Sequence, residues 1–248
     1  LPRWSSPSGR RWRSRLGAGS CRAWSAPDGR FRGSPVYSPD VADLPFDLEA
    51  GLAEQLARVL DVEGKIPRAF EALGPVGGRD VALVDSPDGI RARQLRELGA
   101  RVTLVPSSGS ASFDAPDASA DVLVAAWSAF RAAPDEELAE AARILRPGGR
   151  LLVLQDYGRD DVTTLLGDPP EPHAWSKRDG PYLGRGFRVR VIHCFWTFDS
   201  LDAAGALLEA VFGASGAALA ARLTRARITH NVAIYHRTMG ATELETTA

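Results

Sequence analysis

Acidic and aromatic side chains follow the apolar run Leu151–Leu154 at a spacing that could support proton transfer. Asp156, Tyr157 and Asp160 lie within six residues of that run. A carboxylate can act as a general base and a phenol as a proton donor, so these three residues are candidate catalytic groups. An alternative stays open, in which Asp160 or Asp161 is the N-cap of a short helix that follows.

A second polar turn follows an earlier apolar run, Asp80–Val84. Its residues are Asp85, Ser86, Pro87, Asp88 and Gly89. A turn that leads from a strand into a helix N-terminus is a common place for an anionic ligand. The same sequence is also a good β-turn, so ligand binding and simple turn formation both remain possible interpretations.

These two turns require a sheet that brings strand ends together. Short apolar runs predict strands at 80–84, 101–105, 121–125 and 151–154, and helical patterns predict helices at 41–60, 66–73, 89–99 and 134–145. Alternating strands and helices indicate an α/β fold with a parallel sheet and right-handed crossovers. Ligands of such sheets bind beyond the carboxyl ends of the strands, where both turns fall.

The C-terminal third predicts a strand at 187–198, a helix at 200–223 that is broken at Gly213 and Gly216, and a last strand at 228–238. His193, His230 and His236 fall on these two strands. We interpret them as core or edge histidines, since no third ligand with a matching direction is evident for a metal.

The segment that ends the 134–145 helix carries a recognisable pattern, with Pro147, Gly148 and Gly149 expected to form a positive-φ turn before the strand. Glu140–Leu151 resembles the E-x-x-R-x-L-R-P-G-G-x-L block of class I S-adenosylmethionine-dependent methyltransferases. The resemblance extends from about Arg79 to Tyr157. It implies a Rossmann-like methyltransferase sandwich with a mostly parallel sheet and an antiparallel last strand. The third strand and its helix are shortened, because only a loop of about a dozen residues separates 101–105 from 121–125.

The resemblance also implies a cofactor, S-adenosylmethionine, at the carboxyl edge of the sheet. Carried over by position, its contacts are Asp85, Ser86, Asp88, Gly89, Ser107, Asp114 and Trp127. Two departures are evident. Asp85 and Pro87 stand where the family has glycines that let the backbone approach the cofactor, and Pro106-Ser107 stands where the family has a carboxylate for the ribose hydroxyls.

Composition limits the remaining function classes. The 248 residues are 44% hydrophobic, and the net charge of −1 gives no general argument for nucleic acid. Two isolated cysteines provide neither a zinc motif nor a disulfide framework, which fits a reducing cytoplasm, and no apolar run is long enough to span a membrane.

Residues 1–40 are rich in Arg, Ser, Gly and Pro. We interpret them as a disordered extension, with a nucleic-acid- or lipid-binding arm and a targeting peptide as alternatives. A methyltransferase-like domain over 41–240 and a disordered tail over 241–248 complete the chain.

Three functions therefore compete. The first is methyl transfer to a small molecule, and the second is a non-catalytic binding or regulatory role after loss of the cofactor site. The third, contact with nucleic acid through the arginine-rich arm, is the least favoured. The oligomeric state is open.

Overall fold

The computed structural model describes residues 44–45, 48–86, 88–106 and 112–239, and every structural statement below concerns them. All described residues belong to one compact unit, which lies within Tyr37–Ala248. Pro87, Ser107, the predicted extension and the predicted tail lie outside the described residues.

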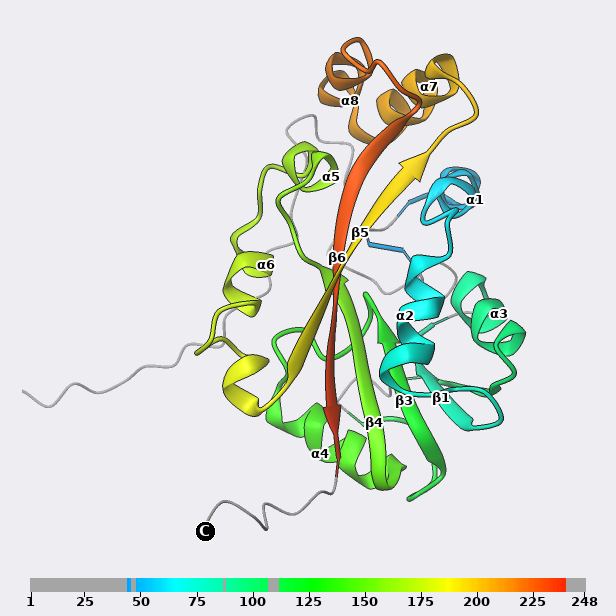
Figure 1. Ribbon diagram of the computed structural model, residues 1–248, viewed down its shortest axis with the longest axis vertical. Coiled ribbons are helices and arrows are strands. Elements are labelled where there is room, and N and C mark those ends of the chain that lie inside the picture. Colours follow the sequence, from blue (N-terminus) through cyan, green and yellow to red (C-terminus); the bar gives the residue numbers. More distant parts are fainter. Residues whose placement is uncertain (1–43, 46–47, 87, 107–111, 240–248) are drawn as a thin grey trace, which may run out of the picture. The chain divides into compact units, whose positions relative to one another are not determined.

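One six-stranded sheet forms the centre of the described part (Figure 1). Its strands are β1 (Asp80–Val84), β2 (Arg101–Val105), β3 (Ala120–Ala126), β4 (Leu145–Asp156), β5 (Arg188–Thr197) and β6 (Arg227–Thr238). Their order is β2-β1-β3-β4-β6-β5. The first four strands are parallel, and β6 lies antiparallel between β4 and β5. The predicted α/β fold with an antiparallel last strand is confirmed.

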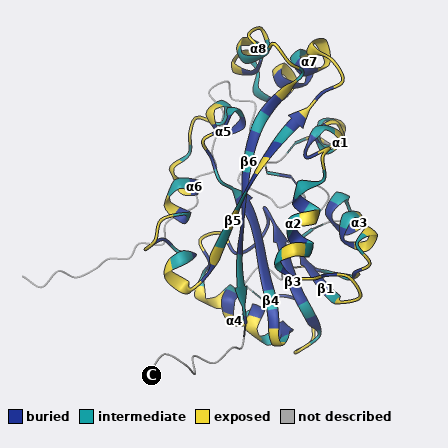
Figure 2. Ribbon diagram, viewed as in Figure 1, coloured by how far each residue is buried: buried dark blue, intermediate teal, exposed yellow. Residues whose placement is uncertain are grey.

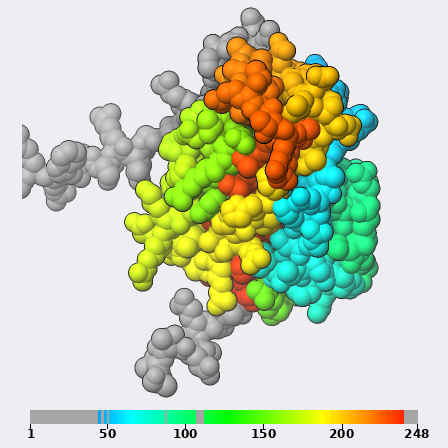
Figure 3. All heavy atoms as spheres, turned by 45° about the horizontal axis from the view of Figure 1, so that its top comes forward, coloured from blue at the N-terminus to red at the C-terminus, as the bar shows by residue number. Residues whose placement is uncertain are grey.

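The helices of the described residues are α1 (Ala50–Val59), α2 (Lys65–Leu73), α3 (Ile90–Glu97), α4 (Asp135–Ile144), α5 (Asp161–Leu165), α6 (Pro170–Trp175), α7 (Leu201–Phe212) and α8 (Ala214–Ala220), with a 3₁₀ turn at Leu183–Arg185. In space-filling view α7 and α8 lie together (Figure 3). Gly213 separates them, as predicted, but Gly216 lies inside α8. The predicted break at Gly216 was wrong, because its missing side chain serves close packing: a Cβ there would meet the Leu208 carbonyl oxygen at 1.9 Å.

Alternating strand residues divide the core into two layers. The central strands β3 and β4 are buried along much of their length (Figure 2). Val81 and Leu83 of β1 face the layer that contains α1, α2, α3 and α7. Ala82 and Val84 face the layer that contains α4 and the segment around Trp175. Burial on both faces explains why the central strands are continuous apolar runs.

The Pro-Gly-Gly segment differs from its prediction. The expected turn is part of β4, which begins at Leu145, and only Gly148 has a positive φ, of 80°. The amide of Gly148 donates to the carbonyl of Met239 at 3.0 Å, and the Met239 amide donates to Gly149 at 2.8 Å. The end of β6 thus holds the segment extended, a long-range contact that local turn chemistry does not reveal.

The shortened third strand is also visible. Between β2 and β3, residues 106 and 112–119 form no helix and no strand. Consequently β2 is an edge strand of the sheet as far as the structure describes it. A cavity of about 260 Å³, lined in part by Thr103, Val105 and Ala115, lies beside this edge.

Candidate functional site

Four side chains meet at the carboxyl edge of the sheet in what we call the indole–imidazole network. Its members are Trp127 after β3, Asp156 at the end of β4, Trp196 of β5 and His230 of β6. The Trp127 indole donates to Asp156 Oδ1 at 2.9 Å, and His230 Nε2 lies 3.1 Å from the same oxygen. The Trp196 indole donates to His230 Nδ1 at 3.2 Å.

These contacts fix the tautomer of His230. Because Nδ1 accepts a hydrogen bond from an indole N–H, the imidazole proton must sit on Nε2, which then donates to Asp156. His230 is fully buried, and its ring stacks on Trp127 with centroids 6.2 Å apart. Two donors therefore orient the Asp156 carboxylate through Oδ1, whereas Oδ2 has no hydrogen bond to any described residue.

Arg91, the second residue of α3, brings a buried charge to the same edge. Its side chain is fully buried, its Nη1 donates to Gln94 Oε1 at 2.7 Å, and its guanidinium lies 5.4 Å from the centre of the Trp127 ring. The neighbouring Ser128 hydroxyl donates to the carbonyl of Val84 at 2.8 Å. Arg91, Trp127 and Ser128 thus occupy the space where the ends of β1 and β3 approach each other.

The predicted turn after β1 forms. Asp85 has a φ of 47°, a conformation unusual for a residue with a side chain, and its amide donates to Val105 at 2.9 Å. The buried Ser86 hydroxyl has no hydrogen-bond partner in the described part of the chain. Asp88 pairs with Arg96 at the surface, and Gly89 is the N-cap of α3. The cofactor contacts assigned to these residues stay predictions.

The acidic turn after β4 anchors α5 to β6. Asp160 is the N-cap of α5: Oδ1 accepts from the Thr163 amide at 2.8 Å, and Oδ2 accepts from the Asn231 amide at 2.9 Å. Asp161 likewise accepts from the amide of Thr229 at 2.8 Å. Both Asp160 oxygens are therefore engaged, which supports the capping interpretation. Tyr157 packs at the edge of the core, and its catalytic role stays a prediction.

Asp114 lies in a loop that the Glu140-x-x-Arg143 pair holds in place. Arg143 donates to the carbonyls of Ala115 at 2.6 Å and Phe113 at 3.0 Å, and Glu140 accepts from the Phe113 amide at 3.1 Å. Hydrogen bonding to Arg143 lowers the pKa of Glu140 to about 2. Glu140 and Arg143 of the methyltransferase-like block thus hold the loop. The Asp114 amide donates to the Pro106 carbonyl at 3.1 Å.

Sequence reasoning did not foresee the roles of Arg91 and Trp196. Arg91 was unremarked because an arginine near a helix start is ordinarily exposed. Trp196 and His230 belong to neighbouring strands, and only the antiparallel register, which pairs Cys194 with His230, brings them together.

Residues 60–153 match the family model described as a methyltransferase domain. The resemblance to class I methyltransferases is confirmed over that segment. The match includes all of β1, β2, β3, α3 and α4, and ends within β4. It therefore covers both the turn after β1 and the Pro-Gly-Gly block.

Solved structures offer weaker likenesses. The MccD protein is 13% identical, with a TM-score of 0.45 over 70% of this chain and 96% of that chain. A candidate methyltransferase from an antibiotic biosynthesis pathway of Anabaena variabilis is 15% identical, with a TM-score of 0.45 over 73% and 99%. One from Anaeromyxobacter dehalogenans is 20% identical, with a TM-score of 0.43 over 70% and 94%. Because these scores lie below 0.5, they do not bear on function. No curated protein matches the sequence.

Two further findings concern the described residues alone. Their histidines, cysteines and carboxylates form no group of three that could hold a metal ion. None of their helices combines the length and the apolar character that a membrane span requires.

Proposed function

We propose that this protein has the methyltransferase fold but is not catalytic: it no longer binds S-adenosylmethionine and acts as a binding or regulatory partner. The observation that carries the proposal is the buried packing of Arg91 on Trp127 between the ends of β1 and β3. In the family, that edge of the sheet receives the methyl donor. Here a fully buried guanidinium packs on an indole that is 7% exposed, which supports the proposal that side chains occupy this edge.

The polar groups present do not fit the methyl donor. The family's first turn offers bare backbone, whereas Asp85 and Ser86 place side chains there. The family's second strand ends in a carboxylate for the ribose, whereas β2 is followed by Pro106, whose carbonyl accepts from Asp114. Each lost buried polar contact reduces the binding free energy by about 1–3 kcal/mol. Together these changes lower the affinity for the cofactor by several orders of magnitude.

One observation favours a second candidate, methyl transfer to a small molecule. Asp156 is oriented by Trp127 and His230 through Oδ1, and its Oδ2 has no partner among the described residues. A carboxylate held in this way is suited to accept a proton from a substrate. This candidate requires Arg91 to leave its position against Trp127 before the donor can bind.

Calorimetric titration of the purified chain with S-adenosylmethionine and S-adenosylhomocysteine separates the two candidates. The non-catalytic proposal predicts no heat of binding with either ligand at millimolar concentration. Binding in the micromolar range would overturn it. The Asp85→Gly variant is titrated in the same way, since glycine suits the positive φ at this position and the change removes only the side chain. We expect this variant to remain without binding, because Arg91 and Trp127 still fill the edge.

A further inference from the structure

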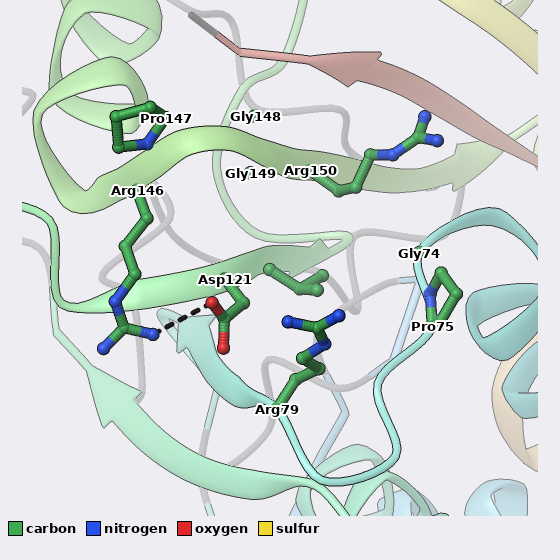
Figure 4. Close-up of a pocket in the computed structure, with 10 residues that line it drawn as sticks. Gly74, Pro75, Arg79, Asp121, Arg146, Pro147, Gly148, Gly149 and Arg150 are labelled. Carbon is green, nitrogen blue, oxygen red and sulfur yellow. Dashed lines mark ion pairs between the residues drawn. The ribbon is translucent and has the colours of Figure 1, made fainter.

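The opposite, amino edge of the sheet contains a basic cavity of about 220 Å³. It lies between the turn that follows α2 and the beginning of β3 and β4 (Figure 4). Its lining includes Gly74, Pro75, Arg79, Asp121, Arg146 and Arg150. None of these residues belongs to the carboxyl edge described above.

Two aspartates at this edge are already neutralised. Asp80 accepts from Arg101 at 2.6 Å and from Arg146 at 2.8 Å, and Asp121 pairs with Arg146 at 3.0 Å. Asp121 also accepts from the Asp80 amide at 3.0 Å. These contacts lower the pKa of both carboxyls, the main causes being the Arg101 side chain for Asp80 and the Asp80 amide for Asp121. Both aspartates are therefore charged at neutral pH and fully engaged.

Two further arginines line the cavity without such partners. Neither Arg79 nor Arg150 makes a side-chain hydrogen bond or ion pair with any residue that the structure describes. In Figure 4 the Arg79 side chain rises into the space between Asp121 and the Gly74–Pro75 turn. The stem of Arg150 lies near Gly74 and its guanidinium end points away from Arg79, so the two arginines share a ligand only after this end turns. The cavity lining thus contains three arginines and one aspartate, which leaves about two positive charges at neutral pH.

Two glycines allow close packing in the wall of this cavity. Gly74 packs directly on β4, where a Cβ would lie 3.3 Å from Arg150 Cβ. Gly149 is equally close to β3, since a Cβ would lie 3.1 Å from the Asp121 carbonyl oxygen. The Arg150 stem and the Asp121 backbone therefore pack closely against these glycines, and the end of Arg150 is the part that can adjust to a ligand.

We propose that the amino-edge cavity binds the phosphate group of a small soluble molecule, with Arg79 and Arg150 as its ligands. Planar guanidinium groups bind phosphate oxygens in pairs, and two of them neutralise a dianion. The cavity is smaller than the roughly 300–1,000 Å³ of common ligand pockets, so it suits a phosphate with a small organic remainder. This inference does not depend on whether the carboxyl edge binds a methyl donor.

The test is calorimetric titration of the whole chain with pyrophosphate, and then with inorganic phosphate, at low ionic strength. We expect saturable binding that weakens as salt is added. Arg79→Gln and Arg150→Gln should each weaken binding about tenfold, and the double variant should abolish it. Arg93→Gln is the matched control, because it removes the same charge from an exposed position on α3 outside the cavity.

Three outcomes would overturn the proposal. One is the absence of binding at millimolar pyrophosphate. Another is an equal loss of affinity in Arg93→Gln, which would mean attraction to overall charge. The third is binding to vesicles that contain phosphatidic acid without any binding of the soluble anions, which would assign the arginines to a membrane headgroup. Thermal unfolding of each variant shows that it is folded.

Discussion

The carboxyl and amino edges of the sheet differ in how their polar side chains are paired. At the carboxyl edge, Trp127, Asp156 and His230 are hydrogen-bonded to one another through Asp156 Oδ1, and Asp156 Oδ2 alone has no partner among the described residues of this network. At the amino edge, two arginines line an open cavity and have no partner among the described residues. The carboxyl edge thus holds side chains that bond to one another, and charge without an ion pair among the described residues is found at the amino edge. Buried, satisfied groups indicate stability, whereas unsatisfied charges in a cavity indicate binding.

The largest effect is expected from Asp156→Ala. It removes the acceptor of two buried donors, the Trp127 indole and His230 Nε2, and should lower the free energy of unfolding by about 3 kcal/mol. Asp156→Asn retains an acceptor oxygen and should lose clearly less. Chemical denaturation measures both. Equal losses in the two variants would mean that charge, rather than satisfaction of the network, stabilises this edge.

Glu140→Gln should lower stability by about 1–2 kcal/mol, since it weakens the clamp formed with Arg143. The pKa of Glu140 is held at about 2 in the folded protein, below its usual 4.5. Its contribution is therefore complete above about pH 4.5 and is lost as the pH falls towards 2. Unfolding measured between these pH values should show the wild type converging on the variant.

Arg58→Ala is the control for that clamp, because Arg58 and Glu54 form an ion pair with side chains 78% and 75% exposed. It should leave stability almost unchanged. A loss as large as that of Glu140→Gln would contradict a specific role for the clamp.

Asp160→Ala should lower stability by about 1 kcal/mol, the usual effect of removing an N-cap. Asp160→Ser can still cap α5 and should recover part of the loss. Hydrogen exchange of the α5 amides reports the same change locally. Unchanged stability and exchange in Asp160→Ala would reject the capping interpretation.

The smallest effects are expected at the amino edge. Arg79→Gln and Arg150→Gln should change the free energy of unfolding by less than about 0.5 kcal/mol, since neither side chain has an ion pair to lose among the described residues. Chemical denaturation without phosphate checks this. A large loss would show that these arginines serve stability, and the contrast between the two edges would disappear.

Local pattern was sufficient for most of the sheet. The run Asp80–Val84 predicts β1 to the residue, because a strand buried on both faces is a nearly unbroken apolar run. Arg101–Val105 predicts β2 to the residue as well, although alternate residues of this edge strand are exposed. The beginning of β4 was missed by six residues. By local pattern Leu145 ends a helix and Pro147–Gly149 forms a turn, and only pairing with β3 and with Met239 makes this segment part of β4.

The site was less predictable for a related reason. Asp156 was identified from its place after a strand, but its partner His230 lies 74 positions later, and their contact depends on the register of β6 against β4. The interpretation of His230 as a core histidine is confirmed by its complete burial. Arg91 could not be found in this way, because nothing in a helix sequence indicates that an arginine will stack on a buried indole.

The most direct test of the contrast between the edges uses one labelled sample and two ligands. Amide resonances of the ¹⁵N-labelled chain are followed during titration with pyrophosphate and, separately, with S-adenosylhomocysteine. We predict that pyrophosphate shifts the amides around Arg79 and Gly148–Arg150, and that S-adenosylhomocysteine shifts none. Saturable shifts at Asp85, Gly89 and Trp127 with S-adenosylhomocysteine would contradict the account and would support methyl transfer as the function.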